Sequence, residues 1–269
     1  MKLAYYIKDS RLELDERVLA LLAELGSAGF DVAPVKEAGD VPEGTEMLLS
    51  FGGDGTFLSA AALASKLSLP VLGVNFGRLG FLSENKPEDV TAALLRKDYS
   101  LEKRGMLCAG GWCLADGPQM ALNEICVMRQ GAAMLGIDVQ IDSRPLPTYW
   151  ADGLLVATSS GSTAYNLSAG GPICMPDTKV LIITPIAPHN LNVRPLVVPE
   201  STKVDIAFES RDGVATMSTD NQTMEIEQDW TIHVEMAQFS LKRIRLAESG
   251  FVRALTSRLF WGEDMRNNG

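Results

Sequence analysis

The chain has little cysteine and even less histidine, which narrows the kinds of site it can build. Only 4 cysteines and 2 histidines occur among its 269 residues. The cysteines, at positions 108, 113, 126 and 174, form no Cys-x-x-Cys pair. A Cys/His zinc site is therefore not expected, and the thiols are predicted to stay free in a reducing cytoplasm.

Long apolar runs and clusters of positive charge are also missing. No stretch approaches the roughly 20 apolar residues of a membrane-spanning helix, and residues 1–8 turn polar too soon for a signal peptide. The formal net charge is −10, without a block of Lys or Arg, which disfavours binding to nucleic acid or to an anionic membrane. These absences predict a cytoplasmic protein without a membrane or nucleic-acid partner. Small anions can still bind wherever backbone N–H groups converge.

What the chain does have is ample apolar sequence and one distinctive glycine loop. Hydrophobic residues make up 46%, enough for one large domain or two modest ones. In Gly52-Gly53-Asp54-Gly55-Thr56 the glycines let backbone N–H groups approach an anion, and the following segment is typical of a helix start. The loop lacks the Lys of a Walker A sequence and the spacing of a dinucleotide fingerprint.

Asp54 is the unusual member of this loop. A carboxylate would repel phosphates unless it accepted a proton from an attacking hydroxyl or helped to hold a metal. The alternative is a tight turn in which Asp54 caps the helix.

Up to about residue 99, runs of strand length alternate with segments of helical spacing. This pattern predicts an α/β N-terminal domain, residues 1–99, with a parallel Rossmann-like sheet whose ligands bind at the C-terminal strand ends. The first helix is expected to stop at Gly26. The predicted strands are residues 3–7, 30–33, 46–51 and 70–75, and the predicted helices cover residues 15–25, the segment from the glycine loop to about 67, and a segment opening at residue 86.

From about residue 100 the helical spacing disappears. Short apolar runs, punctuated by Gly, Pro, Asp and Asn, predict a mostly β second domain over residues 100–248. The expected strands include residues 120–128, 231–234 and 239–246. The amphipathic segment 251–261 is expected to be a helix that packs back on the first domain, so that residues 249–269 join that domain.

Two polar stretches interrupt the β half. Asn123 and Glu124 lie side by side in an apolar run, so they straddle a strand or mark a bend. They suit sugar hydroxyls, although a satisfied structural pair is the favoured interpretation of these two residues alone. From Asp152 to Ile173 a strand leads into a Ser/Thr/Gly loop that suits a heterocycle and its ribose, with a long polar turn as the alternative. A serine nucleophile is disfavoured because no Gly-x-Ser-x-Gly elbow is present.

These motifs, in this order and spacing, resemble those of the NAD kinases. The resemblance is carried by residues 52–56, 75–82, 123–124, 152–173, 188–199 and 259–264, and so covers essentially the whole chain. The first motif also occurs in diacylglycerol- and sphingosine-type lipid kinases and in phosphofructokinases, whereas the stretch from Gly161 to Pro172 is highly specific. The resemblance implies a phosphofructokinase-like first domain and transfer of the γ-phosphoryl group of ATP to the 2′-hydroxyl of the adenosine ribose of NAD.

The resemblance also implies residue roles, with Asp54 as the general base. The glycine loop would form one wall of the site and the β domain the other. A divalent cation, normally Mg²⁺, would travel with ATP, with no protein metal ligands implied, and the chain would assemble as a homodimer or homotetramer. The implied substrate-binding residues are Gly52, Gly53, Gly55 and Thr56 for phosphates, Asn123 and Glu124 for ribose hydroxyls, Asp152, Thr163, Ala164, Tyr165 and Ser168 for the bases, and Gln222 near the substrate.

The sequence departs from the family pattern at three places. Thr158-Ser159-Ser160 replaces a Thr-Pro-Thr, Trp150 stands where many relatives carry a basic residue, and Asp220-Asn221-Gln222 replaces an Asp-Gly-Gln, with Asn221 expected to tolerate the left-handed backbone. These departures leave open the preference between NAD and NADH and the choice of phosphoryl donor. Two other functions remain as alternatives: a lipid kinase, which needs an apolar substrate entrance, and a dinucleotide sensor without catalysis, against which the intact Asp54 argues.

Overall fold

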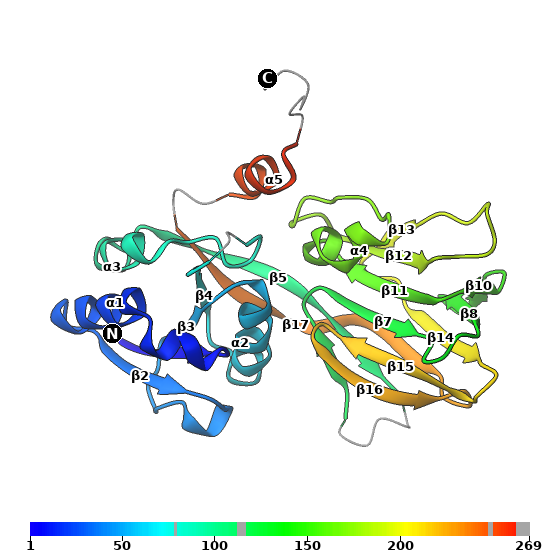
Figure 1. The fold of residues 1–269 in the computed structure, drawn as a ribbon, viewed down its shortest axis with the longest axis horizontal. Helices are drawn as coiled ribbons and strands as arrows, with labels where there is room; N and C mark the ends of the chain where they lie inside the picture. The colour runs from blue at the N-terminus through cyan, green and yellow to red at the C-terminus, as the bar shows by residue number, and fades with distance from the viewer. Residues whose placement is uncertain (78–79, 112–116, 247–249, 262–269) are drawn as a thin grey trace. The chain divides into compact units, whose positions relative to one another are not determined.

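The chain folds into two compact units (Figure 1). The computed structural model describes residues 1–77, 80–111, 117–246 and 250–261. Unit 1 comprises Met1–Lys103 and Leu241–Gly269, and unit 2 comprises Arg104–Ser240. Arg78 and Leu79 of the second motif, Cys113 and the Gly262-Glu263-Asp264 tail lie outside the described residues.

A parallel sheet forms the centre of unit 1. All four strand pairings, β2–β1, β1–β3, β3–β4 and β4–β17, are parallel, which confirms the α/β prediction. Every residue of β3 is buried, as expected for a parallel strand covered on both faces. The strands are β1 (Lys2–Ile7), β2 (Asp31–Val35), β3 (Met47–Phe51), β4 (Val71–Val74) and the C-terminal part of β17 (Ile232–Leu246).

Helices α1 (Glu16–Ser27), α2 (Asp54–Leu67) and α3 (Pro87–Arg96) follow β1, β3 and β4. The apolar faces of α1 and α3 share one core with the sheet, which includes Leu3, Leu25, Leu49 and Val90. Short 3-10 turns, η1 (Ser10–Leu14) and η2 (Ala38–Asp40), complete the connections.

The first helix does not stop at Gly26, as the sequence suggested. It continues to Ser27, and Gly29 takes the positive φ of 86° that turns the chain toward β2. A lone glycine costs a helix only about 1 kcal/mol, so the burial of Val18, Leu21 and Leu25 outweighs it.

The C-terminal helix α5 (Phe251–Leu259) belongs to unit 1, as predicted. The ring of Phe251 lies 5.9 Å from the ring of Phe81. The guanidinium of Arg258 lies over the same ring, at 5.3 Å from its centre. Phe81 therefore fixes the helix on the segment that follows β4.

Unit 2 is mostly β, as predicted. Its six-stranded sheet has the order β13-β12-β11-β7-β15-β16, and every pairing is antiparallel. Those strands are β7 (Glu124–Met128), β11 (Gly153–Thr158), β12 (Val180–Ile186), β13 (Leu196–Pro199), β15 (Val214–Thr219) and β16 (Gln222–Glu227). Strand β11 carries η3 (Ser160–Thr163) and the short α4 (Tyr165–Ser168) at its end.

A second set of strands in unit 2 shares an apolar core with this sheet. Ile125, Leu154 and Ile183 of the six-stranded sheet cluster with Val139, Ile206 and other residues of the second set. The second set comprises β6 (Gln119–Ala121), β8 (Leu135–Ile141), β9 (Arg144–Pro145), β10 (Tyr149–Ala151), β14 (Val204–Glu209) and the parts of β5 (Tyr99–Gly110) and β17 that lie in unit 2.

Three predicted strands have different boundaries. Residues 231–234 and 239–246 fall in one long strand, β17. The run 120–128 is instead divided between β6 and β7, which separate at Leu122 and Asn123. The break occurs because the backbone N–H groups of Leu122 and Asn123 donate to the carboxylate of Asp220 and not to a neighbouring strand.

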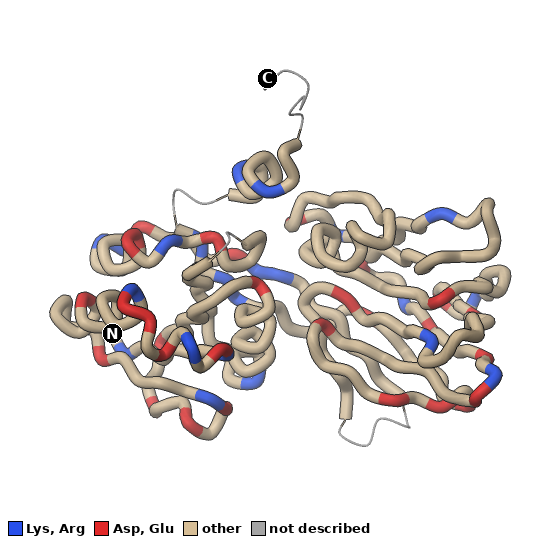
Figure 2. Tube along the Cα trace, viewed as in Figure 1, with Lys and Arg blue, Asp and Glu red and all other residues tan. Residues whose placement is uncertain are grey.

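The surface carries charges of both signs. Acidic and basic residues are interspersed along the described parts of both units (Figure 2). Among the described residues, no helix has the length and apolar character needed to cross a membrane.

The core of unit 1 generates a stability prediction. Leu49→Ala, at a fully buried position of β3, is expected to lower the free energy of unfolding by about 2–5 kcal/mol through lost burial and a cavity. Leu19→Ala on α1 is the matched control, because Leu19 is 50% exposed. Urea unfolding measures both. Equal losses in the two variants would contradict the described core.

Candidate functional site

The glycine loop follows the C-terminal end of β3, and its residues Asp54, Gly55 and Thr56 form the first turn of α2. Gly52 has a φ of 144°, and a Cβ on it would lie 2.5 Å from Oγ1 of Thr56. Its N–H donates to the carbonyl of Val74 at the end of β4, at 2.9 Å. Both its conformation and its surroundings therefore require glycine.

Gly53 and Gly55 keep the backbone at the start of α2 accessible. Gly53 is the N-cap residue of α2, and both glycines are exposed. Among the described residues, no atom lies within 4 Å of the place a Cβ would take on either of them. The start of a helix carries the positive end of the helix dipole, so this end of α2 favours an anion.

Asp54 does not cap its helix, which excludes the alternative interpretation of the loop. Its carboxylate instead accepts hydrogen bonds from three consecutive backbone N–H groups: Phe81 at 2.9 Å, Leu82 at 3.1 Å and Ser83 at 2.9 Å. The guanidinium of Arg258 lies 3.7 Å from Oδ2. Hydrogen bonds to a charged group are the stronger kind, so the carboxylate has a fixed orientation.

The second motif, residues 75–82, builds the support for Asp54. A Cβ on Gly80 would lie 1.7 Å from Oδ1 of Asp54, so only glycine lets the segment approach. Ser83 donates from Oγ to the carbonyl of Gly52 at 2.6 Å, and Asn75 donates from Nδ2 to the carbonyl of Ser83 at 3.0 Å. We call residues 80–85 the Asp54 strap, because they hold the carboxylate against the glycine loop.

In unit 2, Asn123 and Glu124 lie at a bend, one of the two arrangements that the sequence allowed. The carboxylate of Asp220 accepts from the N–H groups of Leu122 and Asn123, each at 2.8 Å, and of Glu124 at 3.2 Å. In return the Asp220 N–H donates to the carbonyl of Glu124 at 3.0 Å. At Leu122 and Asn123 these bonds take the place of strand pairing, so β6 ends and β7 begins on either side of them.

The side chains of Asn123 and Glu124 do not form the satisfied structural pair that the sequence favoured. Both residues are buried, at 6% and 7% exposure. Oδ1 of Asn123 and Oε2 of Glu124 have no hydrogen-bond partner among the residues that the structure describes. Unsatisfied buried oxygens are costly and are typical of a site that a ligand completes.

Glu124 has an unusual ionisation. Burial and, to a lesser extent, the negative charge of Asp220 raise its pKa from about 4.5 to about 8, against the opposing effect of a backbone hydrogen bond from Tyr165. Burial likewise raises the pKa of Asp220, against its three backbone hydrogen bonds. Near neutral pH the Glu124 side chain is therefore mostly protonated, so it can donate one hydrogen bond as well as accept.

The Ser/Thr/Gly loop is joined directly to this bend. Thr158 donates from Oγ1 to the carbonyl of Leu122 at 2.7 Å and accepts from the N–H of Gly161 at 3.0 Å. A Cβ on Gly161 would lie 2.1 Å from the carbonyl oxygen of Asn123. The second and third polar stretches of the sequence thus meet within unit 2.

The other expected base-contacting residues vary in their exposure. Thr163 and Ala164 are half-buried, while Tyr165 and Ser168 are exposed. The Tyr165 hydroxyl lies 3.8 Å from the sulfur of Met128. Burial raises its pKa, and the ionisable groups of Cys126, Glu124 and Asp152 add to that rise.

Asp152 and Gln222 differ in how they are held. Asp152 forms an ion pair with Arg129, at 2.7 Å between Oδ1 and Nε. Gln222 is exposed at the start of β16, opposite Thr219. It follows the Asp220-Asn221 turn, in which Asp220 rather than Asn221 takes the left-handed backbone, with a φ of 52°. Asp220 tolerates it because its side chain is fixed by three hydrogen bonds.

Sequence reasoning missed four residues of these sites: Arg129, Asn166, Arg258 and, as more than a turn residue, Asp220. The amide of Asn166 is buried and ties the third motif together, donating to the carbonyls of Ser162 and Pro172, each at 3.0 Å, and accepting from Thr184 at 2.7 Å. Its place inside a polar stretch was the available signal. Arg129 and Arg258 carry no local signal, because their partners are distant in sequence.

Trp150 also has a structural role that its position in the motif did not reveal. Its ring lies across from Gly136 in the pairing of β10 with β8, 3.1 Å from the place of a Gly136 Cβ. An aromatic side chain covering a cross-strand glycine protects the sheet at that point.

Metal binding by protein side chains alone has little support. In the described part of the chain, no group of three or more His, Cys, Asp or Glu residues could hold an ion. Mg²⁺ is commonly held by substrate phosphates with one or two carboxylates. One carboxylate, Asp54, in the first turn of α2 fits an ion that arrives with a nucleotide.

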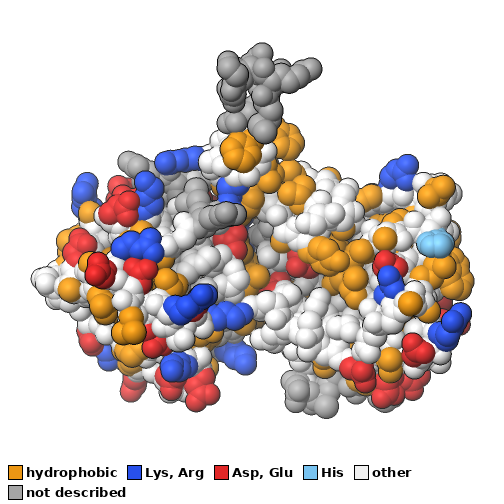
Figure 3. All heavy atoms as spheres, viewed as in Figure 1, with side chains coloured by type: hydrophobic (Ala, Val, Ile, Leu, Met, Phe, Trp, Pro, Cys, Tyr) orange, Lys and Arg blue, Asp and Glu red, His pale blue; other side chains and the backbone are white. Residues whose placement is uncertain are grey.

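Unit 2 exposes apolar side chains as well as these polar groups. Figure 3 shows hydrophobic side chains gathered on one face of this unit. Among the residues of this unit that the structure describes, the exposed large apolar ones are Trp150, Tyr165, Met175, Leu191, Leu196, Val197 and Phe239.

The raised pKa of Glu124 generates a prediction for stability against pH. The folded state holds the Glu124 proton more tightly than the unfolded state, so this residue lowers stability as pH rises from about 4.5 to about 8. Glu124→Gln is therefore expected to gain stability relative to wild type across that window. Urea unfolding as a function of pH measures the difference, with Glu225→Gln on β16, an exposed position, as control. A difference that is constant with pH would contradict the assignment.

Comparison with known protein families and structures gives a consistent result. Residues 10–97 match the ATP-NAD kinase N-terminal domain and residues 122–246 match the ATP-NAD kinase C-terminal domain. An NAD kinase of Flavobacterium psychrophilum is 37% identical over 261 residues, which cover 94% of this chain and 89% of that protein. An NAD kinase of Porphyromonas gingivalis is 39% identical over 230 residues, covering 84% and 80%.

Two solved structures share the fold. The NAD kinase from Archaeoglobus fulgidus, in complex with ATP, has a TM-score of 0.78 and 27% identity and covers 96% of this chain and 98% of that one. The yeast NADH kinase, complexed with NADH, has a TM-score of 0.87 and 23% identity and covers 100% and 90%. The sequence relatives and both domain matches establish that the chain belongs to the NAD kinase family.

Proposed function

We propose that the protein transfers the γ-phosphoryl group of ATP to the 2′-hydroxyl of the adenosine ribose of NAD, with Asp54 as the general base. The observation that carries the proposal is the orientation of Asp54. This residue lies at the start of α2, and its carboxylate is held by the backbone N–H groups of Phe81, Leu82 and Ser83. Family membership makes the protein a phosphotransferase. The role of Asp54 is our own assignment.

Phosphoryl transfer asks mostly for positioning and charge stabilisation. The first turn of α2 and its positive dipole end are proposed to hold phosphate oxygens, with Gly53, Gly55 and Thr56 forming the cradle. Gly52 is proposed to shape the loop, because its own N–H donates to Val74. Asp54 then accepts the proton of the ribose hydroxyl as the new oxygen–phosphorus bond forms and the bond to the leaving ADP breaks.

Unit 2 is proposed to bind the dinucleotide. The orphaned oxygens of Asn123 and Glu124 suit ribose hydroxyls, and a protonated Glu124 adds a donor. The adjoining residues Asp152, Thr163, Ala164, Tyr165 and Ser168 are proposed to contact the bases, with Gln222 nearby. The ring of Tyr165, 38% exposed, offers a face on which a base can stack.

The cation, the assembly and the compartment are further parts of the proposal. Mg²⁺ is proposed to travel with ATP, where it neutralises phosphate charge. A homodimer or homotetramer is supported by the apolar side chains that unit 2 exposes. A cytoplasmic location agrees with the free thiols of Cys108, Cys126 and Cys174.

The proposal predicts that Asp54→Asn loses about 10²–10⁴-fold in turnover, because the hydroxyl no longer has a base. Binding of NAD is expected to persist, since its proposed contacts lie in unit 2. NADP formation from ATP, Mg²⁺ and NAD measures turnover, and calorimetry measures NAD binding.

Asp89→Asn is the matched control, because Asp89 is also an acidic residue in the first turn of a unit 1 helix. It is expected to keep wild-type turnover. A near wild-type rate in Asp54→Asn would show that the base is another group. Tight NAD binding by the wild type without any NADP formation would instead identify a dinucleotide sensor, and phosphorylation of a lipid without NADP formation would identify a lipid kinase.

A further inference from the structure

One buried arginine in unit 1 is outside every motif described so far. Arg243 lies on β17 and is only 2% exposed. Its guanidinium donates from Nη2 to the carbonyl of Leu82 at 3.1 Å and to the carboxylate of Glu84. From Nη1 it donates to Oε2 of Glu102 at 3.2 Å. Two of these three partners belong to the Asp54 strap.

The contact with Leu82 reaches Asp54 through a single peptide plane. The carbonyl that accepts from Arg243 and the N–H of Ser83 belong to the same peptide unit. That N–H donates to Oδ1 of Asp54 at 2.9 Å. Because a trans peptide is planar, with its C=O and N–H pointing in opposite directions, fixing the carbonyl also fixes the direction of the N–H. A cation at the carbonyl polarises the unit and strengthens the N–H as a donor.

The charge of Arg243 is compensated where it lies. A buried cation without a partner is strongly destabilising, and Glu84 and Glu102 supply the two counter-charges. The rigid fork of a guanidinium can bind several acceptors at once, which the single ammonium of lysine cannot reproduce. The geometry therefore asks for arginine, beyond a positive charge.

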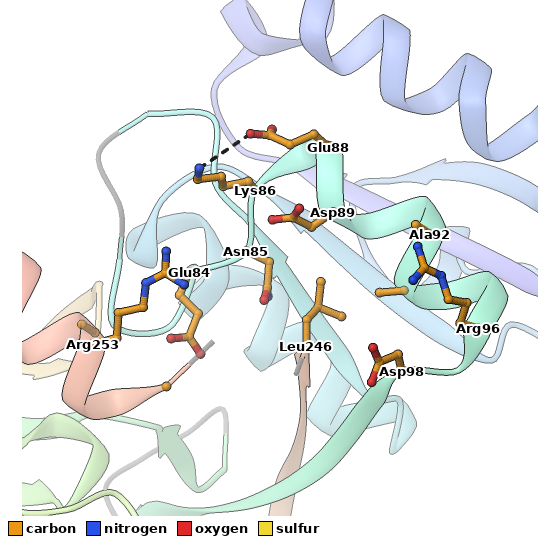
Figure 4. A pocket seen from close by; sticks show the side chains of 13 residues that line it. Glu84, Asn85, Lys86, Glu88, Asp89, Ala92, Arg96, Asp98, Leu246 and Arg253 are labelled. Atoms are coloured by element: carbon orange, nitrogen blue, oxygen red, sulfur yellow. Dashed lines mark ion pairs between the residues drawn. The ribbon is translucent and has the colours of Figure 1, made fainter. Parts of the chain in front are cut away.

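The strap is also fixed on its far side. Asn85 donates from Nδ2 to the carbonyl of Gly73 on β4, at 2.8 Å. Glu84 and Asn85, the last two residues of the strap, line a polar cavity of about 420 Å³ (Figure 4). The cavity is lined further by α3, Leu246 and the start of α5. The contacts of Glu84 with Arg243 and of Asn85 with Gly73 together hold that end of the strap in place.

We propose that Arg243 is a positioning residue for phosphoryl transfer, acting through the Leu82–Ser83 peptide on the Asp54 carboxylate. The inference rests on the proposed role of Asp54 and goes beyond it, because it assigns part of the turnover to a side chain that touches no substrate. Binding of NAD and ATP does not depend on Arg243, whereas the orientation of the base does.

Arg243→Lys tests this assignment. We expect kcat to fall about tenfold or more, while KM for NAD and for ATP changes less than twofold. Arg245→Lys is the matched control, because Arg245 lies two residues further along the same strand and pairs with the same Glu102, at 3.2 Å. Equal losses of kcat in the two variants, or a loss carried by KM, would overturn the proposal.

A double-mutant cycle separates positioning from general loss of structure. Adding Arg243→Lys to Asp54→Asn is expected to cause no further loss of kcat, because the base on which Arg243 acts is already absent. A further tenfold loss would show that Arg243 acts independently of Asp54. If Asp54→Asn alone were fully active, the proposed function would fail first, so the two failures are distinguishable.

If Arg243→Lys does not fold, Glu84→Gln replaces it in the same cycle. The neutral amide still accepts from Arg243 but holds it less strongly, so a smaller kcat loss is expected, again absent in the Asp54→Asn background. An unchanged kcat in Glu84→Gln, with unfolding as in wild type, would count against the proposal.

Discussion

The hydrogen bonds from Phe81, Leu82 and Ser83 to Asp54 are the interaction on which the proposed chemistry of unit 1 depends. Hydrogen bonds to a charged group contribute about 1.5–3 kcal/mol each, and three consecutive donors leave the carboxylate one orientation. The approach is possible because neither Gly80 nor Gly73 has a side chain: a Cβ on Gly73 would lie 2.9 Å from Leu82 and Ser83 backbone atoms. Gly73 and Gly80 are therefore required for the contact between the strap and the Asp54 carboxylate.

Unit 2 uses the same device for a different purpose. Asp220 accepts from three consecutive N–H groups, those of Leu122, Asn123 and Glu124. Here the bound backbone, not the carboxylate, carries the functional side chains. Asp220 also adds a buried negative charge that helps to keep Glu124 protonated. In each unit, therefore, one aspartate accepts from three consecutive backbone N–H groups. The donating segment follows β4 in unit 1 and separates β6 from β7 in unit 2.

The sequence predicted the elements whose signals are local. Alternating apolar runs and helical spacing predicted the α/β sheet of unit 1, and short punctuated runs predicted the β character of unit 2. The predicted limits of strands were wrong where residues distant in the sequence determine them. The break at Asn123 depends on Asp220, almost a hundred residues later in the chain. Gly26 failed as a helix stop because burial of the neighbouring leucines outweighs a small propensity cost.

The candidate site was predictable in its motifs and less so in its supports. Asp54, Asn123 and Glu124 stood out because polar groups in apolar surroundings need a reason. The partners that orient them gave no such signal. Arg243 lies in a strand pattern with other charged residues, and Arg258 lies on a helix whose packing only the fold reveals. Backbone donors such as the N–H of Ser83 have no side-chain identity in a sequence at all.

The most direct test of this account is amide hydrogen exchange at Phe81, Leu82 and Ser83, measured on the wild-type protein and on Asp54→Ala. If the carboxylate binds these three N–H groups, their exchange is slow in wild type and becomes much faster in the variant, while amides of β1 stay protected in both. Rapid exchange at all three positions in wild type, or protection unchanged in Asp54→Ala, would contradict the central claim that the strap holds the base.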